Sequence, residues 1–248
     1  MVIRSALAIC LLVACDASVS GGGAASEGVD AATGEELVDA ADEPDAPGAC
    51  PNGRDIYLSF AGETLTKPPG NSPSDATQNR VKWMGVATAN VPGYRLNDPD
   101  RTTKIATITQ RITTALADFP MQVVTTRPPS GPYVMIVFGG TRDLLGTQYS
   151  YAVNDFDCGD QAKSDVAWVS DVVPFDKVDD YAIGAIGYGL GLGGTDDPDD
   201  CMCGWANGCN QPDTSQCTLS PSIAADPVCS GAPNPQDEVA AFETAFCN

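Results

Sequence analysis

Two features of this sequence have residue types that could support chemistry: a run of aspartates and a set of ten cysteines. Clustered carboxylates are the ligands that calcium prefers, and such a cluster is formed by Asp196, Asp197, Asp199 and Asp200. Their spacing does not reproduce an EF-hand loop, and no glutamate follows at the closing position. The four aspartates are therefore a weak calcium candidate, and a solvated acidic loop is the competing interpretation.

The chain contains no histidine, and this absence excludes several mechanisms. A Ser-His-Asp triad, a Cys-His dyad and a histidine-ligated zinc site all need an imidazole ring. A lysine-assisted serine hydrolase would need a serine (Ser150 or Ser164) beside a lysine (Lys163 or Lys177), but the sequence has no S-x-x-K pattern. It also lacks the D-T-G signature of carboxylate-dyad proteases. No familiar hydrolase mechanism is predicted.

A glycine-rich segment, residues 184–194, carries a more specific pattern, Gly-Ala-Ile-Gly-Tyr-Gly-Leu-Gly-Leu-Gly-Gly. The zinc-binding helix of metzincin peptidases reads H-E-x-x-H-x-x-G-x-x-H, and a methionine turn follows it. In that register Gly191 is the glycine of the motif, and Met202 stands where the methionine turn belongs. The common non-ligand residues of the motif are also matched, at Ile186, Gly187, Leu190 and Leu192.

The chain therefore resembles a metzincin-like (zincin) metallopeptidase domain, in particular the secreted lipoprotein members of that group. Further similar stretches are spread over the chain, at 55–60, 122–128, 133–138 and 157–159. The resemblance implies a mixed β-sheet packed with helices and a peptide-accepting groove along a sheet edge beside the helix. The scaffold positions that it retains are Gly187, Gly191 and Met202.

The positions that perform zinc chemistry in this family are all changed. The three histidine positions hold Gly184, Tyr188 and Gly194, and the position of the catalytic glutamate holds Ala185. The resemblance therefore implies an inactive domain with no zinc ligand and no general base. The alternative is a buried, glycine-rich helix with no link to peptidases, although each glycine costs a helix about 1 kcal/mol relative to alanine.

The first 49 residues indicate export. Residues 1–14 combine a basic start with a short apolar run, as in a signal peptide. The run ends in Leu-Val-Ala-Cys, which resembles a bacterial lipobox and predicts acylation of Cys15; an ordinary signal peptide is the alternative. Residues 15–49 hold nine acids and no base, and we expect them to be a disordered tether. The lipid would be the only membrane anchor, in the cell envelope.

Eight cysteines remain after Cys10 in the signal and Cys15 at the lipid site. In an exported chain they predict disulfides, whose pairing the sequence leaves open. The spacing of the central cysteines lacks the paired C-x₂-C knuckles of a zinc ribbon, so that alternative is disfavoured. The eight are Cys50, Cys158, Cys201, Cys203, Cys209, Cys217, Cys229 and Cys247.

Hydrophobic periodicity predicts one α+β domain over residues 50–248. Strands are predicted at 55–60, 121–126, 133–138 and 166–169, the third of them central because it is apolar throughout. Helices are predicted at 98–119, 179–192 and 234–247; Asp98 and Asn234-Pro235 open the first and the last, and Val239, Phe242 and Phe246 face inward in the last. Residues 195–233 should be a cysteine-rich, irregular segment.

The net charge of −20 makes nucleic acid an improbable partner, because phosphates would be repelled. Together with the resemblance, it favours an envelope lipoprotein that binds a peptide or another envelope protein without cleaving it. A residual metalloendopeptidase with unusual ligands and a purely structural lipoprotein are the alternatives. Apart from the calcium candidate, no cofactor is predicted.

Overall fold

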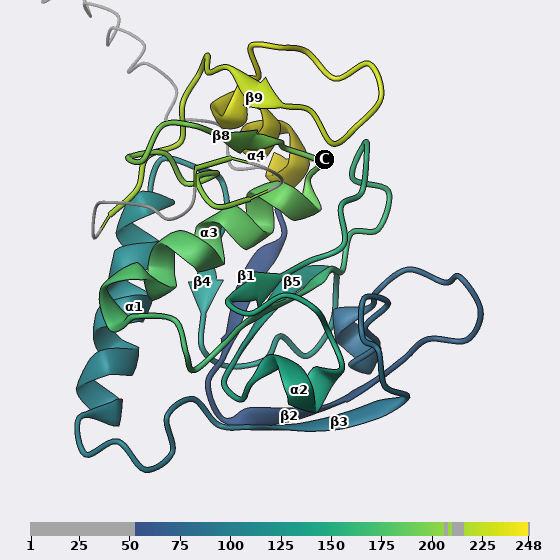
Figure 1. The fold of residues 1–248 in the computed structure, drawn as a ribbon, viewed down its shortest axis with the longest axis vertical. Coiled ribbons are helices and arrows are strands. Elements are labelled where there is room, and N and C mark those ends of the chain that lie inside the picture. Colours follow the sequence, from purple (N-terminus) through teal and green to yellow (C-terminus); the bar gives the residue numbers. More distant parts are fainter. Residues whose placement is uncertain (1–52, 206–207, 210–215, 248) are drawn as a thin grey trace, which may run out of the picture. The chain divides into compact units, whose positions relative to one another are not determined.

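The computed structural model describes residues 53–205, 208–209 and 216–247. They form the mixed α+β fold that the sequence predicts, with helices packed on a mixed sheet (Figure 1). The sheet has five strands in the order β4-β1-β5-β7-β6. Their bounds are Asp55–Ser59 for β1, Val123–Val124 for β4, Tyr133–Phe138 for β5, Ala152–Val153 for β6 and Val166–Val169 for β7.

The predicted central strand is confirmed. β5 lies in the middle of the sheet, between β1 and β7, and all six of its residues are buried. The pairs β4-β1, β1-β5 and β5-β7 are parallel, which suits strands covered on both faces. β6 is the exception, because it runs antiparallel to β7 and is the last strand on its side. Within the described residues, its outer edge therefore has no strand beside it.

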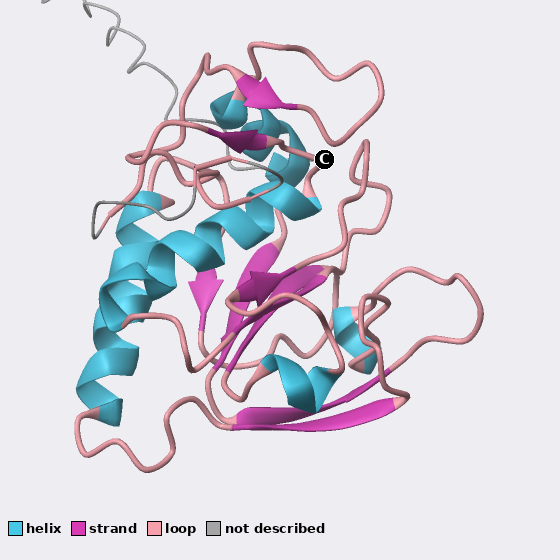
Figure 2. Cartoon of the chain, viewed as in Figure 1, coloured by secondary structure: helices cyan, strands magenta, loops and turns pink. Residues whose placement is uncertain are grey.

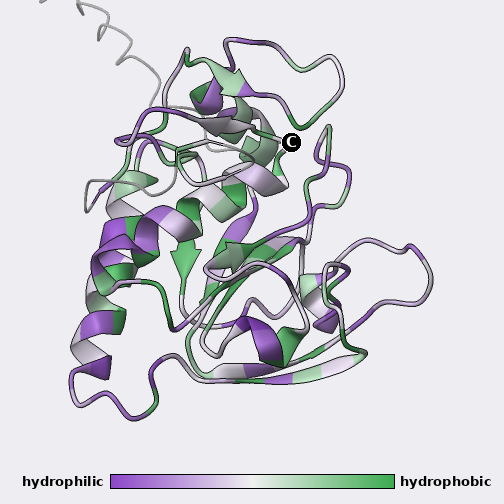
Figure 3. Ribbon diagram, in the orientation of Figure 1, coloured by the Kyte–Doolittle hydropathy of each residue, from purple (hydrophilic) through white to green (hydrophobic). Residues whose placement is uncertain are grey.

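One face of the sheet is covered by three helices, α1 (Arg101–Ala115), α3 (Val178–Gly189) and α4 (Glu238–Cys247) (Figure 2). Alternate side chains of the strands point into this layer, for example Ile56, Leu58 and Ile136. α1 is amphipathic and shows hydrophilic and hydrophobic bands in Figure 3, since only one of its faces meets the core. α3 is apolar on almost all its faces, and accordingly nearly every one of its residues is buried.

The opposite face of the sheet is covered by elements that periodicity did not predict. They are the hairpin of β2 (Gly62–Thr66) and β3 (Thr88–Pro92), the short helix η1 (Ala76–Gln78) and α2 (Arg142–Leu145). The hairpin could not be found from periodicity because it has few buried apolar residues, chiefly Leu65 and Val91, and because a long loop separates its strands. A second short helix, η2 (Phe175–Lys177), leads into α3.

Several predicted boundaries differ from the structure: α1 ends at Ala115 rather than at 119 and α3 at Gly189 rather than at 192, and three further differences have a visible cause or size. α1 begins at Arg101 rather than at 98, because the Asp98 carboxylate accepts from the Asp100 amide in a turn before the helix and from Lys104 Nζ. α4 begins at Glu238 rather than at 234, because the Asn234 side chain bonds both backbone groups of Ala225 within a loop. β4 has only two of the six residues predicted as a strand.

The cysteine-rich segment is largely irregular and is held by disulfides. Its regular structure is a short pairing of β8 (Gly194–Thr195) with β9 (Ala225–Asp226). Disulfides join Cys158 to Cys229, Cys201 to Cys217 and Cys203 to Cys209, and Cys247 is disulfide-bonded as well. The predicted disulfides are confirmed for these seven cysteines, and the pairing of the central four leaves no thiolates for a zinc ribbon.

Some predictions fall on residues that the structure does not describe. These are the signal peptide at 1–14, the lipid site Cys15, the tether at 15–49 and the disulfide candidate Cys50. Among the helices of the described part, none has the length and apolar character needed to cross a bilayer.

Candidate functional site

The glycine-rich segment forms most of α3, and charged side chains at the start of this helix fix its position. Asp179 pairs with Arg111 of α1 at 3.3 Å, and Asp180 accepts from the Cys217 amide at 2.9 Å. Both carboxylates are buried in the first turn of the helix, where the helix dipole favours negative charge. Burial nevertheless dominates and raises the pKa of Asp180 to about 7. The helix is thereby tied to α1 and to the cysteine-rich segment.

At its other end, α3 stops in a sharp turn at Gly191. The φ angle of Gly191 is +86°, a left-handed conformation that favours glycine. A Cβ added there would also lie 2.7 Å from Cys229 Sγ, so the turn packs against a disulfide. The predicted scaffold residues Gly187 and Met202 are in contact too, since a Cβ on Gly187 would lie 2.6 Å from Met202 Sδ. The methionine therefore packs directly against the helix.

Of the four positions that the metzincin register would assign to the zinc ligands and the glutamate, three are packed tightly and Tyr188 is half-buried. A Cβ on Gly184 would collide with the Trp205 indole and with the Cys201 carbonyl, and one on Gly194 would collide with the Trp205 carbonyl. Ala185 is fully buried in the core. Tyr188 is half-buried, with its ring centroid 5.3 Å from that of Trp205. Trp205 thus fills the space onto which the two glycines face.

Beside this closed region lies an open pocket of about 350 Å³ between α3 and the edge strand β6. Tyr181 and Tyr188 of α3 form one wall, with Trp205 next to them. The opposite wall is the β6 strand and its approach, where Tyr151 lies 5.5 Å from Tyr181 between ring centroids. The lining also contains Tyr149, Ser150, Ala152, Val153, Asn154 and Gly204.

The floor of the pocket is held by hydrogen bonds of one buried residue, Asn154. Asn154 is buried, and its Nδ2 donates to the Ala185 carbonyl at 3.0 Å while its Oδ1 accepts from the Asp155 amide. These bonds hold the end of β6 against α3. Phe156, the next residue but one, meets Tyr188 edge-on at 5.8 Å between centroids. The aromatic walls therefore combine two tyrosines of α3 with aromatic residues of the loops beside β6 and after Met202.

Burial sets the protonation of the two phenols that α3 contributes to the pocket. Burial raises the pKa of Tyr181 to about 12, and the nearby Asp180 carboxylate adds to the rise. Burial also raises the pKa of Tyr188, with Asp155 contributing in the same direction. Both phenols therefore stay protonated at neutral pH and can donate or accept hydrogen bonds.

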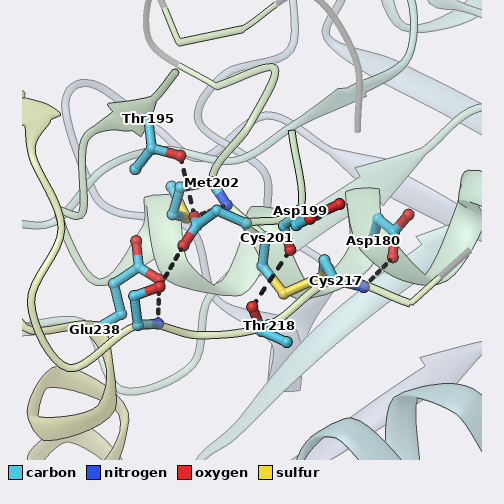
Figure 4. Close-up of a disulfide and its surroundings, with 10 residues drawn as sticks. Asp180, Thr195, Asp199, Cys201, Met202, Cys217, Thr218 and Glu238 are labelled. Atoms are coloured by element: carbon cyan, nitrogen blue, oxygen red, sulfur yellow. Dashed lines mark hydrogen bonds between the residues drawn. A yellow bond between two sulfur atoms is a disulfide. The ribbon is translucent and has the colours of Figure 1, made fainter. Parts of the chain in front are cut away.

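The turn that carries Met202 is held by a buried carboxylate network (Figure 4). The Asp200 carboxylate accepts from the Met202 amide, from Thr195 Oγ1 and from Ser220 Oγ, and Glu238 Oε2 of α4 accepts from the Ser220 amide. Burial raises the pKa of Glu238 to about 8. The network and the Cys201–Cys217 disulfide fix the segment that brings Trp205 to α3.

The calcium candidates do not act as one set. Asp200 is buried in the network just described, whereas Asp196, Asp197 and Asp199 are exposed. Within the described residues, no three side chains of the His, Cys, Asp and Glu types are arranged to hold a metal ion. Of the serine and lysine candidates, Lys163 pairs with Asp160 at 2.8 Å and Ser150 accepts from Arg142.

Sequence reasoning missed the aromatic residues that define the pocket. Tyr149 and Tyr151 flank β6, a strand too short to show a period, and Trp205 lies in a segment without regular structure. The available signal was an alternation of aromatic residues in Tyr149-Ser-Tyr151 and a tryptophan three residues after Met202.

Comparison with known protein-family models and with curated proteins found no match to this chain.

Proposed function

We propose that this protein is a non-catalytic, metzincin-like binding module that holds an extended peptide against the outer edge of β6. The observation that carries the proposal is the contrast between two neighbouring regions. The space onto which Gly184 and Gly194 face is filled by Trp205, whereas the pocket beside Tyr188 is open. A site that has lost its chemical groups and kept an open cleft suits binding better than cleavage.

The geometry of α3 supports the resemblance on which this proposal draws. The motif requires a chain reversal at its glycine, and Gly191 adopts a positive φ there. It also requires a methionine beneath the helix, and Met202 packs against Gly187. The groove that the resemblance implies lies along a sheet edge beside the helix, and β6 is an edge strand next to α3.

The edge of β6 has backbone groups suited to strand addition. The Ser170 amide donates to the Tyr151 carbonyl, and Ala152 is paired with Val169. Ala152 is therefore in a non-hydrogen-bonded pair, and its own N–H and C=O are directed away from β7. An extended peptide can bond these groups without displacing any strand. The aromatic pocket next to Ala152 would then receive a side chain of that peptide.

In this proposal the domain works in a bacterial cell envelope, on an acidic tether whose lipid is attached at Cys15. The sequence alone supports this part. A purely structural lipoprotein would bind no peptide, and a residual metallopeptidase would cleave peptides in a chelator-sensitive way.

The test uses a library of capped, seven-residue peptides and the purified full-length protein with its disulfides formed. We expect some peptides to bind, to be recovered intact with or without chelator, and to lose affinity when alternate backbone nitrogens are methylated. Ala152→Pro, which removes an outward N–H, should weaken binding, whereas Leu96→Ala, an exposed change outside the pocket, should not. Chelator-sensitive cleavage, or no binding by any peptide, would overturn the proposal.

A further inference from the structure

The pocket beside β6 is surrounded by exposed aromatic surface. Among the large hydrophobic side chains of the described residues, few are well exposed, and three of these lie here. Tyr149 is 48% exposed, Tyr151 is 37% exposed and Phe156 is 48% exposed. Tyr149 and Tyr151 line the pocket, and Phe156 contacts Tyr188 on its rim. Aromatic side chains left in water at one place mark an interaction site rather than a packing fault.

The lining of this pocket is aromatic and carries no formal charge. None of its ten residues is lysine, arginine, aspartate or glutamate. The carboxylates of Asp180 and Asp155 act on the phenols of Tyr181 and Tyr188. The cations near the rim already have acidic or hydroxyl partners, because Lys82 pairs with Asp155 at 3.1 Å and Arg142 donates to Ser150 and pairs with Asp143. The chain as a whole carries a net charge of −20.

We infer that the pocket receives the cationic end of a lysine or arginine side chain, so that the peptide held at β6 is basic; this inference rests on the proposed function. The faces of tyrosine and tryptophan rings attract a cation through their quadrupoles, and the attraction grows when water is excluded. The phenol oxygens accept hydrogen bonds from ammonium or guanidinium N–H groups. The acidic chain as a whole steers a basic peptide toward the site.

A neutral apolar side chain would fill the same volume but would gain nothing from the acidic charge of the chain or from the ring quadrupoles. This difference makes the inference testable with peptides of matched shape. Four capped, seven-residue peptides differ only in their central residue, which is arginine, citrulline, lysine or norleucine. Citrulline keeps the length of arginine, norleucine keeps the four-carbon stem of lysine, and both remove the charge.

Binding is measured by calorimetry with the full-length, disulfide-bonded protein at low and at high salt. We expect the arginine and lysine peptides to bind about tenfold more tightly than their neutral counterparts at low salt. The advantage should shrink at high salt, because screening weakens the contribution of the chain's acidic charge. Tyr188→Leu should reduce the ratio toward one, and Tyr149→Ser on the exposed rim should reduce it without risk to the fold. Leu96→Ala is the matched control and should leave the ratio unchanged.

The outcomes separate the two proposals. Equal affinity of charged and neutral peptides overturns the cationic preference and leaves peptide binding intact. Tighter binding of a proline-rich peptide than of the arginine peptide overturns it in favour of polyproline recognition. If none of the peptides in this set or in the library binds, the proposed function itself fails.

Discussion

Tyr188 of α3 and Trp205 of the cysteine-rich segment lie with their ring centroids 5.3 Å apart and their planes tilted by 31°. The two rings join the helix to the segment that follows Met202, on the side of α3 where the proposed register puts the zinc ligands. Trp205 packs against Gly184, and both rings form a wall of the pocket beside it. The same aromatic contact therefore fills the space next to Gly184 and borders the open pocket.

Alanine substitutions at two glycines of α3 should have unequal effects. A Cβ at residue 184 meets the Cys201 backbone and the Trp205 indole, whereas a Cβ at residue 187 meets the flexible side chain of Met202. Alanine raises helix propensity equally at both sites. We expect Gly184→Ala to lower the free energy of unfolding by about 2–3 kcal/mol and Gly187→Ala to lower it by less than about 1 kcal/mol. Urea denaturation followed by circular dichroism measures both; equal effects would contradict the packing seen around Trp205.

The stability of the domain should fall as the pH rises from 4 to 8. Burial raises the pKa of Asp165 to about 8, of Asp180 to about 7 and of Glu238 to about 8. A carboxyl group whose folded pKa is raised binds its proton more tightly in the folded state, so stability is lost between the unfolded and the folded pKa values. We expect the Tm to be at least about 5 °C higher at pH 5 than at pH 8.

The variant Glu238→Gln tests the origin of this pH dependence. The amide can still accept from the Ser220 N–H and cannot ionise, so its Tm should change less between pH 5 and pH 8 than that of the unmodified protein. A Tm that rises with pH in the unmodified protein would show that ion pairs outweigh the buried carboxyl groups.

The disulfides should differ in their contribution to stability. Cys158–Cys229 spans 71 residues, whereas Cys203–Cys209 spans 6. The entropy that a cross-link removes from the unfolded chain grows with the loop it closes. Replacing the first pair by serines should cost about 4 kcal/mol and replacing the second about 2 kcal/mol. Chemical denaturation of the two double variants, each with the other bridges intact, gives the comparison; the reverse order would mean that native contacts around the short loop dominate.

The predicted lipid site can be examined apart from the folded domain. When the full-length chain is produced in a bacterium fed with a clickable fatty acid, it should be labelled, and Cys15→Ser should remove at least about nine-tenths of the label, because the thiol is the acceptor. Cys10→Ser is the matched control, since Cys10 lies inside the apolar run that is removed with the signal. Label that survives Cys15→Ser would show that the lipobox assignment is wrong.

Much of the sheet could be predicted because its strands carry their own signal. β5 is apolar over its full length, and Ile56 and Leu58 alternate on one face of β1. The helices were found from their apolar spacing, but their first turns were misjudged. Asp98 and Asn234 look like helix caps in the sequence, whereas in the structure both serve turns and loops that precede a helix.

The pocket could not be predicted in the same way. Its walls come from β6 near residue 152, from α3 near residue 185 and from Trp205, and only the folded chain brings these segments together. Gly191 and Met202 were singled out because they fit the metzincin register, which stays a prediction. Trp205 has no such position, and its role follows only from its contact with Gly184.

Trp205 lies inside the short loop closed by the Cys203–Cys209 bridge, and the neighbouring Cys201–Cys217 bridge anchors that loop to the turn before it. The two disulfides therefore help to fix one wall of the pocket. If the chain is exported and binds a peptide as proposed, its binding surface would be completed only where disulfides can form, and recognition would be coupled to an oxidising compartment.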